Sequence, residues 1–591
     1  MRENGQRAPG GAAAIVAALA EAGTTVLFGV PGGGPNLDVV GAAQAAGLRF
    51  VLTHTETAAV IMAATCADLT GRPGAAVVTR GPGLASAVNG IAHAALDRLP
   101  VVVIADTVRS AEATRISHQR LDLAALGLSA GRRAITVGRD RPGEAAAEAV
   151  RLALQPPAGP VVALMDDTGA SGPFAPAEPP LQDRTGGDHL AVLAGALRAA
   201  RRPVLLLGTG AIAHTAALRA ALAGRGLPAL HTYRARGIMP DSGGEAAGLV
   251  TGATMEWPLL AAADLILGLG VDEAEMIPGA WDYAAPTLLA GGYPAGPPAY
   301  FSGATWLPVT LPAAIGVLAA DASGHDWPPD TGRAARAAVT RRLAATATSA
   351  PGALSPVQVV TAVRSRAPQE AVVTVDAGAH MLAVMPLWET GTPRRLLISS
   401  GLATMGYALP AAIGAALAGP GAPATRGEPA ARGELVIAFT GDGGLGMALA
   451  ELETAVRLKL RIAVVVFNDS TLSLIKIKQR PAGQGGPAAV GYGAVSYAGM
   501  ACAMGATAVA ASTEDEVAQA ISAAAQRDGV TVVDVRTDPG SYPAIMELSR
   551  GQAGRVPLPG LPELPGLPGL PGLQTSPGTP PGRMATAKEQ C

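Results

Sequence analysis

The sequence predicts an α/β protein that consists of three doubly wound parallel-sheet domains. The chain of 591 residues is long enough for three or four domains of ordinary size. From about residue 12 onwards, helical patterns alternate with short, continuous apolar runs. Such runs are typical of strands that are buried on both faces of a parallel sheet, and their alternation with helices is typical of βαβ units.

The composition excludes several classes of protein. Hydrophobic residues make up 49% of the chain but aromatic residues only 3%, so the core must be built from closely packed Ala, Val and Leu. The formal net charge is −2 and the pI is near 6.5. This balance gives no electrostatic reason to expect a nucleic acid or an anionic membrane as a partner.

The cysteines and the N-terminal segment indicate a cytoplasmic protein. Cys66, Cys502 and Cys591 are scattered and form neither a CxxC motif nor a disulfide framework. The apolar segment 11–22 contains Glu21 and lacks a signal-peptide pattern, so it predicts an amphipathic helix. No run of about 20 strong hydrophobes predicts a membrane span.

We expect an N-terminal domain over residues 8–170. Its strand patterns, several of which lead into glycine-rich turns, cover residues 25–28, 49–53, 75–79 and 100–105. Glu56 follows the second of these strands and precedes an apolar helix, so we expect its carboxyl group to be poorly solvated and able to share a proton with a ring nitrogen. The alternative is a first-turn glutamate that interacts with the helix macrodipole.

Two further domains and a tail follow. The segment 166–188 is rich in Pro and Gly and predicts a linker. The second domain is expected over residues 188–325, with another linker up to Ser349, and the third over residues 353–547. Residues 548–591 repeat Gly-Leu-Pro and predict an extended, disordered tail, to which we assign no function.

The second domain contains a weak dinucleotide fingerprint. A predicted strand runs into GxGxxA at Gly208–Ala213, a pattern that would suit a nicotinamide-dependent dehydrogenase. However, the next strand pattern, Leu227–Leu230, leads into His231 and not into the acidic residue that binds a ribose. We therefore keep the dehydrogenase only as an alternative.

The third domain holds the most informative stretch. An apolar strand pattern, Leu435–Phe439, ends at Gly441–Gly444, a helical pattern follows, and a second strand pattern, Ile462–Phe467, ends at Asn468 and Asp469. This is one βαβ unit with its polar residues at the carboxyl ends of both strands, where open α/β sheets bind ligands.

These residue types point to a metal-bound phosphate. Glycines after a strand let the backbone approach a phosphate, but the Asp442 carboxylate would repel one unless a cation lay between them. Mg²⁺ takes oxygen ligands and usually shares them with a diphosphate. Asp442, Asp469 and a backbone carbonyl near Thr471 could supply three of them.

At this point the chain resembles the thiamine diphosphate (ThDP) enzymes, whose diphosphate motif is GDG followed one βαβ unit later by NN. The second asparagine is Asp469 in this chain. The resemblance covers about Ala12–Glu547 and is strongest to the acetolactate synthase-like branch. It implies three domains: a pyrimidine-binding domain, a Rossmann-like middle domain and a diphosphate domain. It also implies ThDP and Mg²⁺ as cofactors and a homodimer or tetramer whose active sites lie between subunits.

The resemblance also assigns roles to single residues. Glu56 matches the glutamate that activates the cofactor, and Gln119 a glutamine that lines the substrate pocket; the alternative for Gln119 is a surface amide. His380 matches a turn beside the cofactor, although a lone histidine is more often structural. Met405 matches the apolar side chain under the cofactor, or is a core methionine. The remaining cofactor contacts are expected from Ala379, Gly441, Asp442, Gly443, Gly444, Asp469, Thr471 and Leu472.

Two departures from the family pattern concern FAD and the substrate. Acetolactate synthases carry an Arg-Phe-Asp-Asp type segment where this chain has Gly268–Glu275 without an arginine, so FAD is doubtful. Lys478 replaces a tryptophan that shapes the acceptor site, which suits a substrate with a second anionic group unless the side chain points to solvent.

The expected function is a ThDP- and Mg²⁺-dependent, acetolactate synthase-like carboligase. It would decarboxylate a pyruvate-like 2-keto acid and join the remaining acyl unit to an acceptor carbonyl. The alternatives are a decarboxylase that does not ligate and a catalytically silent ThDP-binding paralogue.

Overall fold

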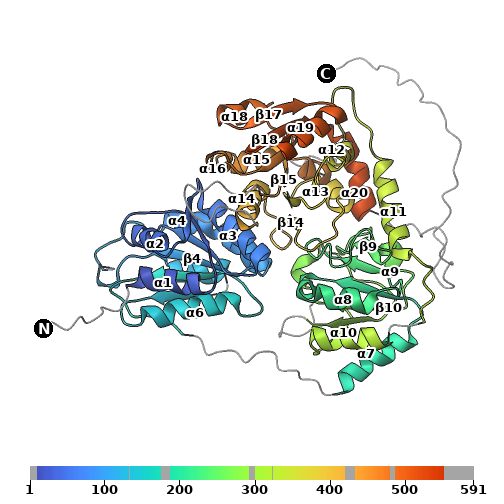
Figure 1. The fold of residues 1–591 in the computed structure, drawn as a ribbon, viewed down its shortest axis with the longest axis horizontal. Coiled ribbons are helices and arrows are strands. Elements are labelled where there is room, and N and C mark those ends of the chain that lie inside the picture. Colours follow the sequence, from blue (N-terminus) through green and yellow to red (C-terminus); the bar gives the residue numbers. More distant parts are fainter. Residues whose placement is uncertain are drawn as a thin grey trace, which may run out of the picture.

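The computed structural model describes residues 10–551, except for residues 113, 132, 175–186, 278, 292–299, 322–323, 420–432 and 480–485. The described chain forms three six-stranded sheets whose strands pair in parallel, arranged in three lobes along the sequence (Figure 1). Helices cover the sheets and bury both faces, since neighbouring strand residues such as Leu27 and Phe28 belong to different apolar clusters. The predicted fold class is therefore confirmed.

The N-terminal sheet has the strand order β2-β1-β3-β4-β6-β5. Its strands are β1 (Val26–Val30), β2 (Arg49–Leu52), β3 (Gly74–Val78), β4 (Val101–Asp106), β5 (Arg133–Val137) and β6 (Val161–Met165). Its helices are α1 (Gly11–Glu21), α2 (Pro35–Ala45), α3 (Glu56–Thr70), α4 (Pro82–Leu96), α5 (Leu123–Ala130) and α6 (Pro142–Leu154). The Thr55 side chain caps α3 by accepting a hydrogen bond from the Ala58 amide, so the helix begins at Glu56.

The C-terminal sheet repeats this topology with the order β14-β13-β15-β16-β18-β17. Its strands are β13 (Val372–Val375), β14 (Leu396–Ile398), β15 (Val436–Gly441), β16 (Ile462–Asn468), β17 (Thr507–Ala511) and β18 (Val530–Arg536). Its helices are α12 (Pro356–Arg364), α13 (Met381–Leu387), α14 (Ala408–Ala418), α15 (Asp442–Ala448), α16 (Glu451–Arg457), α17 (Ser473–Lys478), α18 (Tyr497–Ala503), α19 (Glu514–Gln526) and α20 (Tyr542–Arg550). In both sheets the strand order reverses beside the first strand, which creates a crevice at the carboxyl edge.

The middle sheet has the order β12-β11-β10-β7-β8-β9. Its strands are β7 (Pro203–Leu207), β8 (Ala229–His231), β9 (Ala246–Leu249), β10 (Leu265–Leu269), β11 (Thr287–Ala290) and β12 (Thr305–Leu307). The helices of this part are α7 (Gly187–Ala199), α8 (Thr215–Leu222), α9 (Trp257–Leu260) and α10 (Leu311–Asp321). This is the strand order of dinucleotide-binding Rossmann folds.

Two predictions on local structure are corrected. The second linker contains helix α11 (Thr331–Ala344), because its alanines favour a helix and its Arg336 is buried against the carbonyls of Asp241 and Ala246. The helical pattern after Gly444 forms two short helices, α15 and α16, instead of one. Most of the first linker and residues 552–591 of the tail lie outside the described residues. Within residues 10–551, gaps excepted, no helix has the length and apolarity that a membrane span requires.

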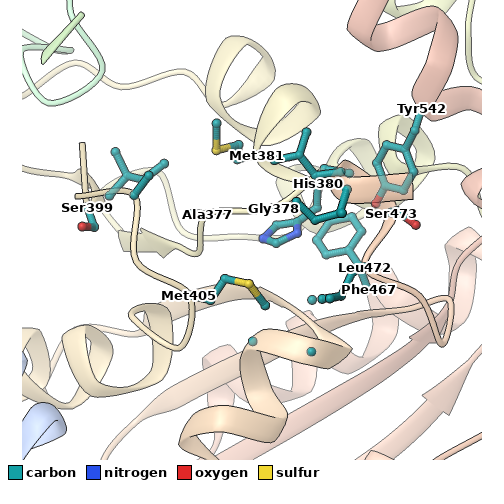
Figure 2. A pocket seen from close by; sticks show the side chains of 18 of the residues that line it. Ala377, Gly378, His380, Met381, Ser399, Met405, Phe467, Leu472, Ser473 and Tyr542 are labelled. Atoms are coloured by element: carbon teal, nitrogen blue, oxygen red, sulfur yellow. The ribbon is translucent and has the colours of Figure 1, made fainter. Parts of the chain in front are cut away.

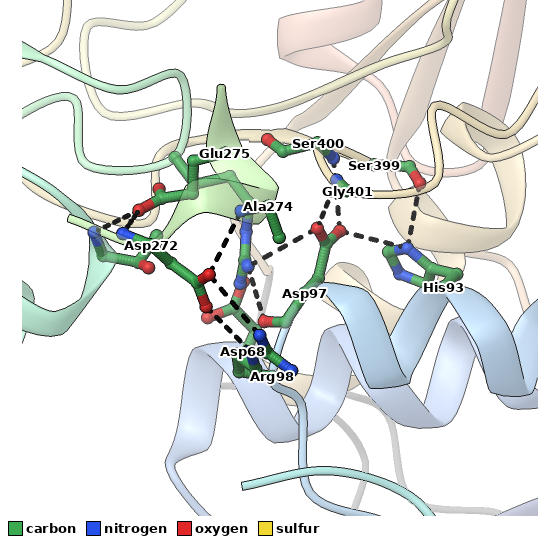
Figure 3. A network of polar contacts seen from close by, with 12 residues as sticks. Asp68, His93, Asp97, Arg98, Asp272, Ala274, Glu275, Ser399, Ser400 and Gly401 are labelled. Atoms are coloured by element: carbon green, nitrogen blue, oxygen red, sulfur yellow. Dashed lines mark hydrogen bonds and ion pairs between the residues drawn. The ribbon is translucent and has the colours of Figure 1, made fainter. Parts of the chain in front are cut away.

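Buried ion pairs connect the three lobes (Figure 3). Arg234, which follows β8 in the middle domain, donates to the Asp68 carboxylate of α3 at 2.7 Å and to the Asp97 carbonyl at 2.7 Å. Asp97 in turn accepts hydrogen bonds from the backbone amides of Ser400 and Gly401 in the C-terminal domain. Burial opposes ionisation of Asp97, but Arg234, His93 and the Gly401 amide together outweigh it and lower the pKa of this carboxyl group. The ions are therefore paired, as buried charges must be.

Candidate active site

A cavity of about 380 Å³ opens at the carboxyl edge of the C-terminal sheet (Figure 2). It lies where the strand order reverses, over the ends of β13, β15 and β16. Every residue of the C-terminal domain that the sequence predicted for the site lines this one cavity: Ala379, His380, Met405, Gly441, Asp442, Gly443, Gly444, Asp469, Thr471 and Leu472. The fold therefore brings together residues that are up to about ninety positions apart in sequence.

The turn after β15 requires glycine at Gly444. A Cβ atom there would lie 2.1 Å from a carboxylate oxygen of Asp376, which is buried beneath the turn. Asp376 accepts hydrogen bonds from the Thr440 hydroxyl at 2.6 Å and the Ala408 amide at 2.7 Å. Burial raises the pKa of Asp376 to about 6. The glycine thus allows the backbone to pack on this aspartate and leaves the opposite side open to the cavity.

The two acidic residues of the site lie at the ends of neighbouring strands. Asp442 begins helix α15; its Oδ1 accepts from the Gly443 amide at 2.6 Å, while its Oδ2 is buried without a partner among the described residues. Asp469 follows β16 and accepts from the Thr471 amide at 2.9 Å and the Ser473 hydroxyl at 2.6 Å. Burial, together with the nearby Asp442 charge, raises the pKa of Asp469 to about 7.

This pair fits a cation that is shared with a phosphate. Burial raises the pKa of both carboxyl groups, and the Asp442 charge raises that of Asp469 further. A divalent ion bound between them would offset this repulsion and give the buried Asp442 Oδ2 a partner. No group of three or more His, Cys, Asp or Glu side chains suited to a metal occurs in the described residues. Mg²⁺ commonly uses one or two protein carboxylates and completes its octahedron with phosphate oxygens and water. The Thr471 carbonyl already accepts a hydrogen bond from the Ser473 amide at 2.8 Å.

His380 and Met405 face the same cavity (Figure 2). The His380 imidazole is stacked on Phe467 with ring centroids 5.1 Å apart, and its Nε2 is buried without a partner in the described chain. Burial lowers the pKa of His380 to about 4, so the ring is neutral at pH 7. The Met405 side chain comes within 3.4 Å of the position that a Cβ atom on Gly443 would take. Both side chains can contact a ligand bound at the glycine turn.

Glu56 and Gln119 do not line this cavity. They lie at the carboxyl edge of the N-terminal sheet on either side of the turn after β3: Glu56 Oε1 is 3.5 Å from the Cβ position of Gly83, and Gln119 crowds that of Gly81. Glu56 is only partly buried in the single chain, so the expected poor solvation is not met there. Gln119 adopts a positive φ of 56°. The two N-terminal residues thus lie near each other, apart from the cavity of the C-terminal domain.

Sequence reasoning missed one wall of the cavity. Tyr233, Glu275 and Arg550 come from the middle domain and the last helix, and they lie opposite residues of the C-terminal domain only after folding. Lys478, which the sequence did single out, also lines the cavity. No motif in the sequence around Tyr233 or Arg550 indicates a ligand site.

The fold and the cavity define an α/β protein in which two domains of identical sheet topology precede and follow a Rossmann-like domain in the sequence, with an acidic, glycine-rich cavity where the strand order of the last sheet reverses. Comparison with known proteins agrees with this class. The chain matches the N-terminal TPP binding domain of thiamine pyrophosphate enzymes over residues 10–126, the central domain over residues 190–287 and the C-terminal TPP binding domain over residues 376–535.

Full-length relatives point the same way. The acetolactate synthase of Bacillus subtilis (strain 168) is 29% identical over 548 residues, which cover 89% of this chain and 93% of that protein. The catabolic acetolactate synthase of Raoultella terrigena is 28% identical over 561 residues, or 91% and 96% of the two chains. The large subunit of acetolactate synthase isozyme 1 of Escherichia coli (strain K12) is 26% identical over 550 residues, which cover 89% of this chain and 94% of that protein. The chain belongs to the acetolactate synthase-like family of ThDP-dependent enzymes.

Proposed function

We propose that this protein is a Mg²⁺- and ThDP-dependent carboligase that decarboxylates a 2-keto acid and joins the acyl unit to an acceptor carbonyl. The observation that carries the proposal is the Asp442–Asp469 pair beside the turn 441–444, since a cation held by the pair would lie next to a phosphate held by the turn. The Asp442 Oδ2 atom, buried without a partner in the described chain, supports a cation there.

Different residues of the chain would then bind the metal ion, the diphosphate and the rest of the cofactor. Asp442, Asp469 and the Thr471 carbonyl would hold Mg²⁺, and the glycine turn 441–444 would lie against the diphosphate. When bound, ThDP supplies the carbon nucleophile and the electron sink that decarboxylation of a 2-keto acid requires. Met405 would support the cofactor from below, and His380, neutral at pH 7, can donate or accept a hydrogen bond at the reacting carbonyl.

The proposal requires a second copy of the chain. Glu56 lies in a different half-site from Asp442, so one cofactor would span the C-terminal site of one subunit and the N-terminal site of another. Large apolar side chains are exposed near both half-sites, among them Leu52 and Leu121 in the N-terminal domain and Met447 and Tyr492 in the C-terminal domain. Exposed apolar side chains at both half-sites would suit an interface between subunits.

Lys478 and Arg550 favour a 2-keto acid with a second anionic group. Both cations line the cavity from neighbouring helices, α17 and α20, and neither forms an ion pair with a described residue. Arg550 lines the cavity beside Tyr233, and its charge favours ionisation of the Tyr233 hydroxyl group, whose pKa burial raises to about 12. A cationic wall opposite the acidic metal pair would bind the distal anion of a substrate.

The test is a panel of keto acids with ThDP and Mg²⁺, in which CO₂ and acyloin are measured separately. The panel includes a monoanion, pyruvate, and a dianion, 2-oxoglutarate. Acyloin formation supports the carboligase, CO₂ without acyloin supports the decarboxylase alternative, and no turnover with any keto acid contradicts both. The Lys478→Gln variant should raise KM for the dianion only. Lys459→Gln, at the opposite edge of the sheet, serves as the matched control.

A mixing experiment tests the shared site. Glu56→Gln and Asp442→Asn each damage one half-site, so each homo-oligomer should have little activity when ThDP is kept well below the Kd of the Asp442→Asn variant. In mixed dimers one of the two sites escapes both substitutions, and random pairing should restore about a quarter of wild-type activity. An absence of any recovery in verified mixed dimers would contradict a site that is built from two chains.

A further inference from the structure

The middle domain has the topology of a dinucleotide-binding fold. Its strand order reverses between β7 and β10, and the fingerprint Gly208–Ala213 follows β7. In such folds the dinucleotide lies across this crevice, and the backbone amides of the glycine turn donate to its phosphates. FAD, which the family implies, and NAD, which the fingerprint suggests, can therefore be tested against the residues of this crevice.

The amides of the glycine turn are already satisfied by the protein. The Thr209 amide donates to Glu275 Oε2 at 3.1 Å, the Gly210 amide to the Gly270 carbonyl at 2.9 Å, and the Ala211 amide to the Gly208 carbonyl at 3.0 Å. None of these three donors is left for a phosphate. In addition, residues Thr209–His214 form a 3₁₀ helix and α8 begins only at Thr215, so no α-helix N-terminus faces the turn.

The glycines of the fingerprint allow a close approach of the backbone at Gly270, not of a phosphate. A Cβ atom at Gly208 would lie 2.3 Å from the Gly270 carbonyl oxygen, and one at Gly210 would lie 2.9 Å from it. Gly270 itself has a φ of +62°, which favours glycine. The turns after β7 and β10 therefore pack on each other across the crevice that a dinucleotide would need.

The carboxylate of Glu275 joins the remaining polar groups of the crevice. Besides the Thr209 amide, it accepts hydrogen bonds from the Thr232 hydroxyl after β8 at 2.5 Å and from the Asp272 amide at 3.2 Å. Glu275 is only 7% exposed. It belongs to a capping box with Asp272, whose carboxylate is held by Arg98 of the N-terminal domain at 2.7 Å (Figure 3).

We propose that the Glu275 carboxylate takes the position of a dinucleotide phosphate and closes the middle domain to both FAD and NAD. One anion bridges the ends of β7 and β8, as a phosphate would, and its negative charge repels any other. The segment that contains Glu275 contributes instead to the cavity of the C-terminal domain, because Ala274, Glu275 and Ile277 line the same cavity as Asp442. This inference does not depend on the proposed reaction.

The first test measures flavin and nucleotide binding to the full-length protein. After purification and denaturation, the supernatant should show no flavin absorbance. FAD, NAD and ADP should not raise the melting temperature of protein that is already saturated with ThDP and Mg²⁺. Flavin near one equivalent per chain, or clear stabilisation by FAD or NAD, would overturn the proposal, while the response to ThDP reports separately on the proposed function.

The second test removes the internal anion. Glu275→Ala frees the Thr209 amide and the Thr232 hydroxyl, so the variant should melt at a lower temperature than wild type, and millimolar ADP should recover part of the loss. Glu273→Ala, an exposed neighbour in the same turn, is the matched control and should behave as wild type. Equal responses of Glu275→Ala and wild type to ADP would overturn the proposal. If Glu275→Ala does not fold, Thr232→Val removes one contact of the same carboxylate for the same comparison.

Discussion

The Glu451 carboxylate of the C-terminal domain accepts a hydrogen bond of 2.9 Å from the backbone amide of Thr55 in the N-terminal domain. The same oxygen accepts from the His54 amide at 3.0 Å. Glu451 is fully buried at the start of α16, and Thr55 caps the helix that begins with Glu56. The N-terminal half-site is thus held by a residue nine positions beyond Asp442 in the chain.

Replacing Glu451 by Ala should destabilise the protein, because two amides would lose their acceptor at a buried site. The expected cost is about 2 to 3 kcal/mol, seen as a lower melting temperature. Glu453→Ala is the control on the same helix: its carboxylate pairs with His54 at 2.8 Å in an exposed position, so the cost should stay within about 0.5 kcal/mol. Equal melting temperatures of the two variants would contradict the role given to Glu451.

Glu56→Gln should lower turnover by roughly two orders of magnitude or more while ThDP still binds, because the amide cannot exchange a proton with the cofactor's ring. Turnover is measured under saturating substrate, and ThDP affinity by calorimetry in the presence of Mg²⁺. Glu112→Gln, in the same domain, should leave both quantities unchanged. A Glu56→Gln variant with wild-type turnover would remove Glu56 from the mechanism.

Asp442→Asn and Asp469→Asn should differ in their effect on ThDP binding. Asp442→Asn removes the charge whose Oδ2 lacks a partner in the described chain, and ThDP affinity should fall roughly tenfold or more at fixed Mg²⁺. Asp469→Asn leaves the Asp442 carboxylate charged, keeps an oxygen ligand at position 469 and removes the group whose pKa the Asp442 charge raises, so it should bind nearly as wild type does. Calorimetric titration at several Mg²⁺ concentrations distinguishes the two; the reverse order would contradict the ligand assignment.

Stability should fall with acid because of His231. This ring is fully buried, its Nε2 accepts the Met239 amide at 3.1 Å, and burial lowers its pKa from 6.5 to about 4. Between these values the unfolded chain binds the extra proton, so the stability that is present above pH 6.5 is lost as the pH falls, by about 3 kcal/mol at pH 4. Melting temperatures from pH 7 to pH 4.5 should fall less in His231→Gln than in wild type or in the exposed control His118→Gln. Parallel curves would contradict this assignment.

That the turn 441–444 and Asp469 lie together could be predicted because these residues are local in sequence. Gly441–Gly444 and Asp469 lie within one βαβ unit, and the carboxyl ends of adjacent parallel strands must meet at one edge. The apolar runs that formed β13, β15 and β16 were likewise readable, since strands buried on both faces need continuous hydrophobic residues. The break between helices α15 and α16 could not be predicted, because an alanine- and leucine-rich segment can form either one long helix or two short ones.

The sequence by itself determined the three α/β domains and the acidic glycine-rich turn, since hydrophobic period and turn chemistry act over a few residues. Only the tertiary structure decided that Glu275 fills the crevice after Gly208 and that Tyr233 and Arg550 complete the cavity. These relationships join residues that are tens to hundreds of positions apart. They arise from how whole domains pack, and packing between domains leaves no periodic signal along the chain.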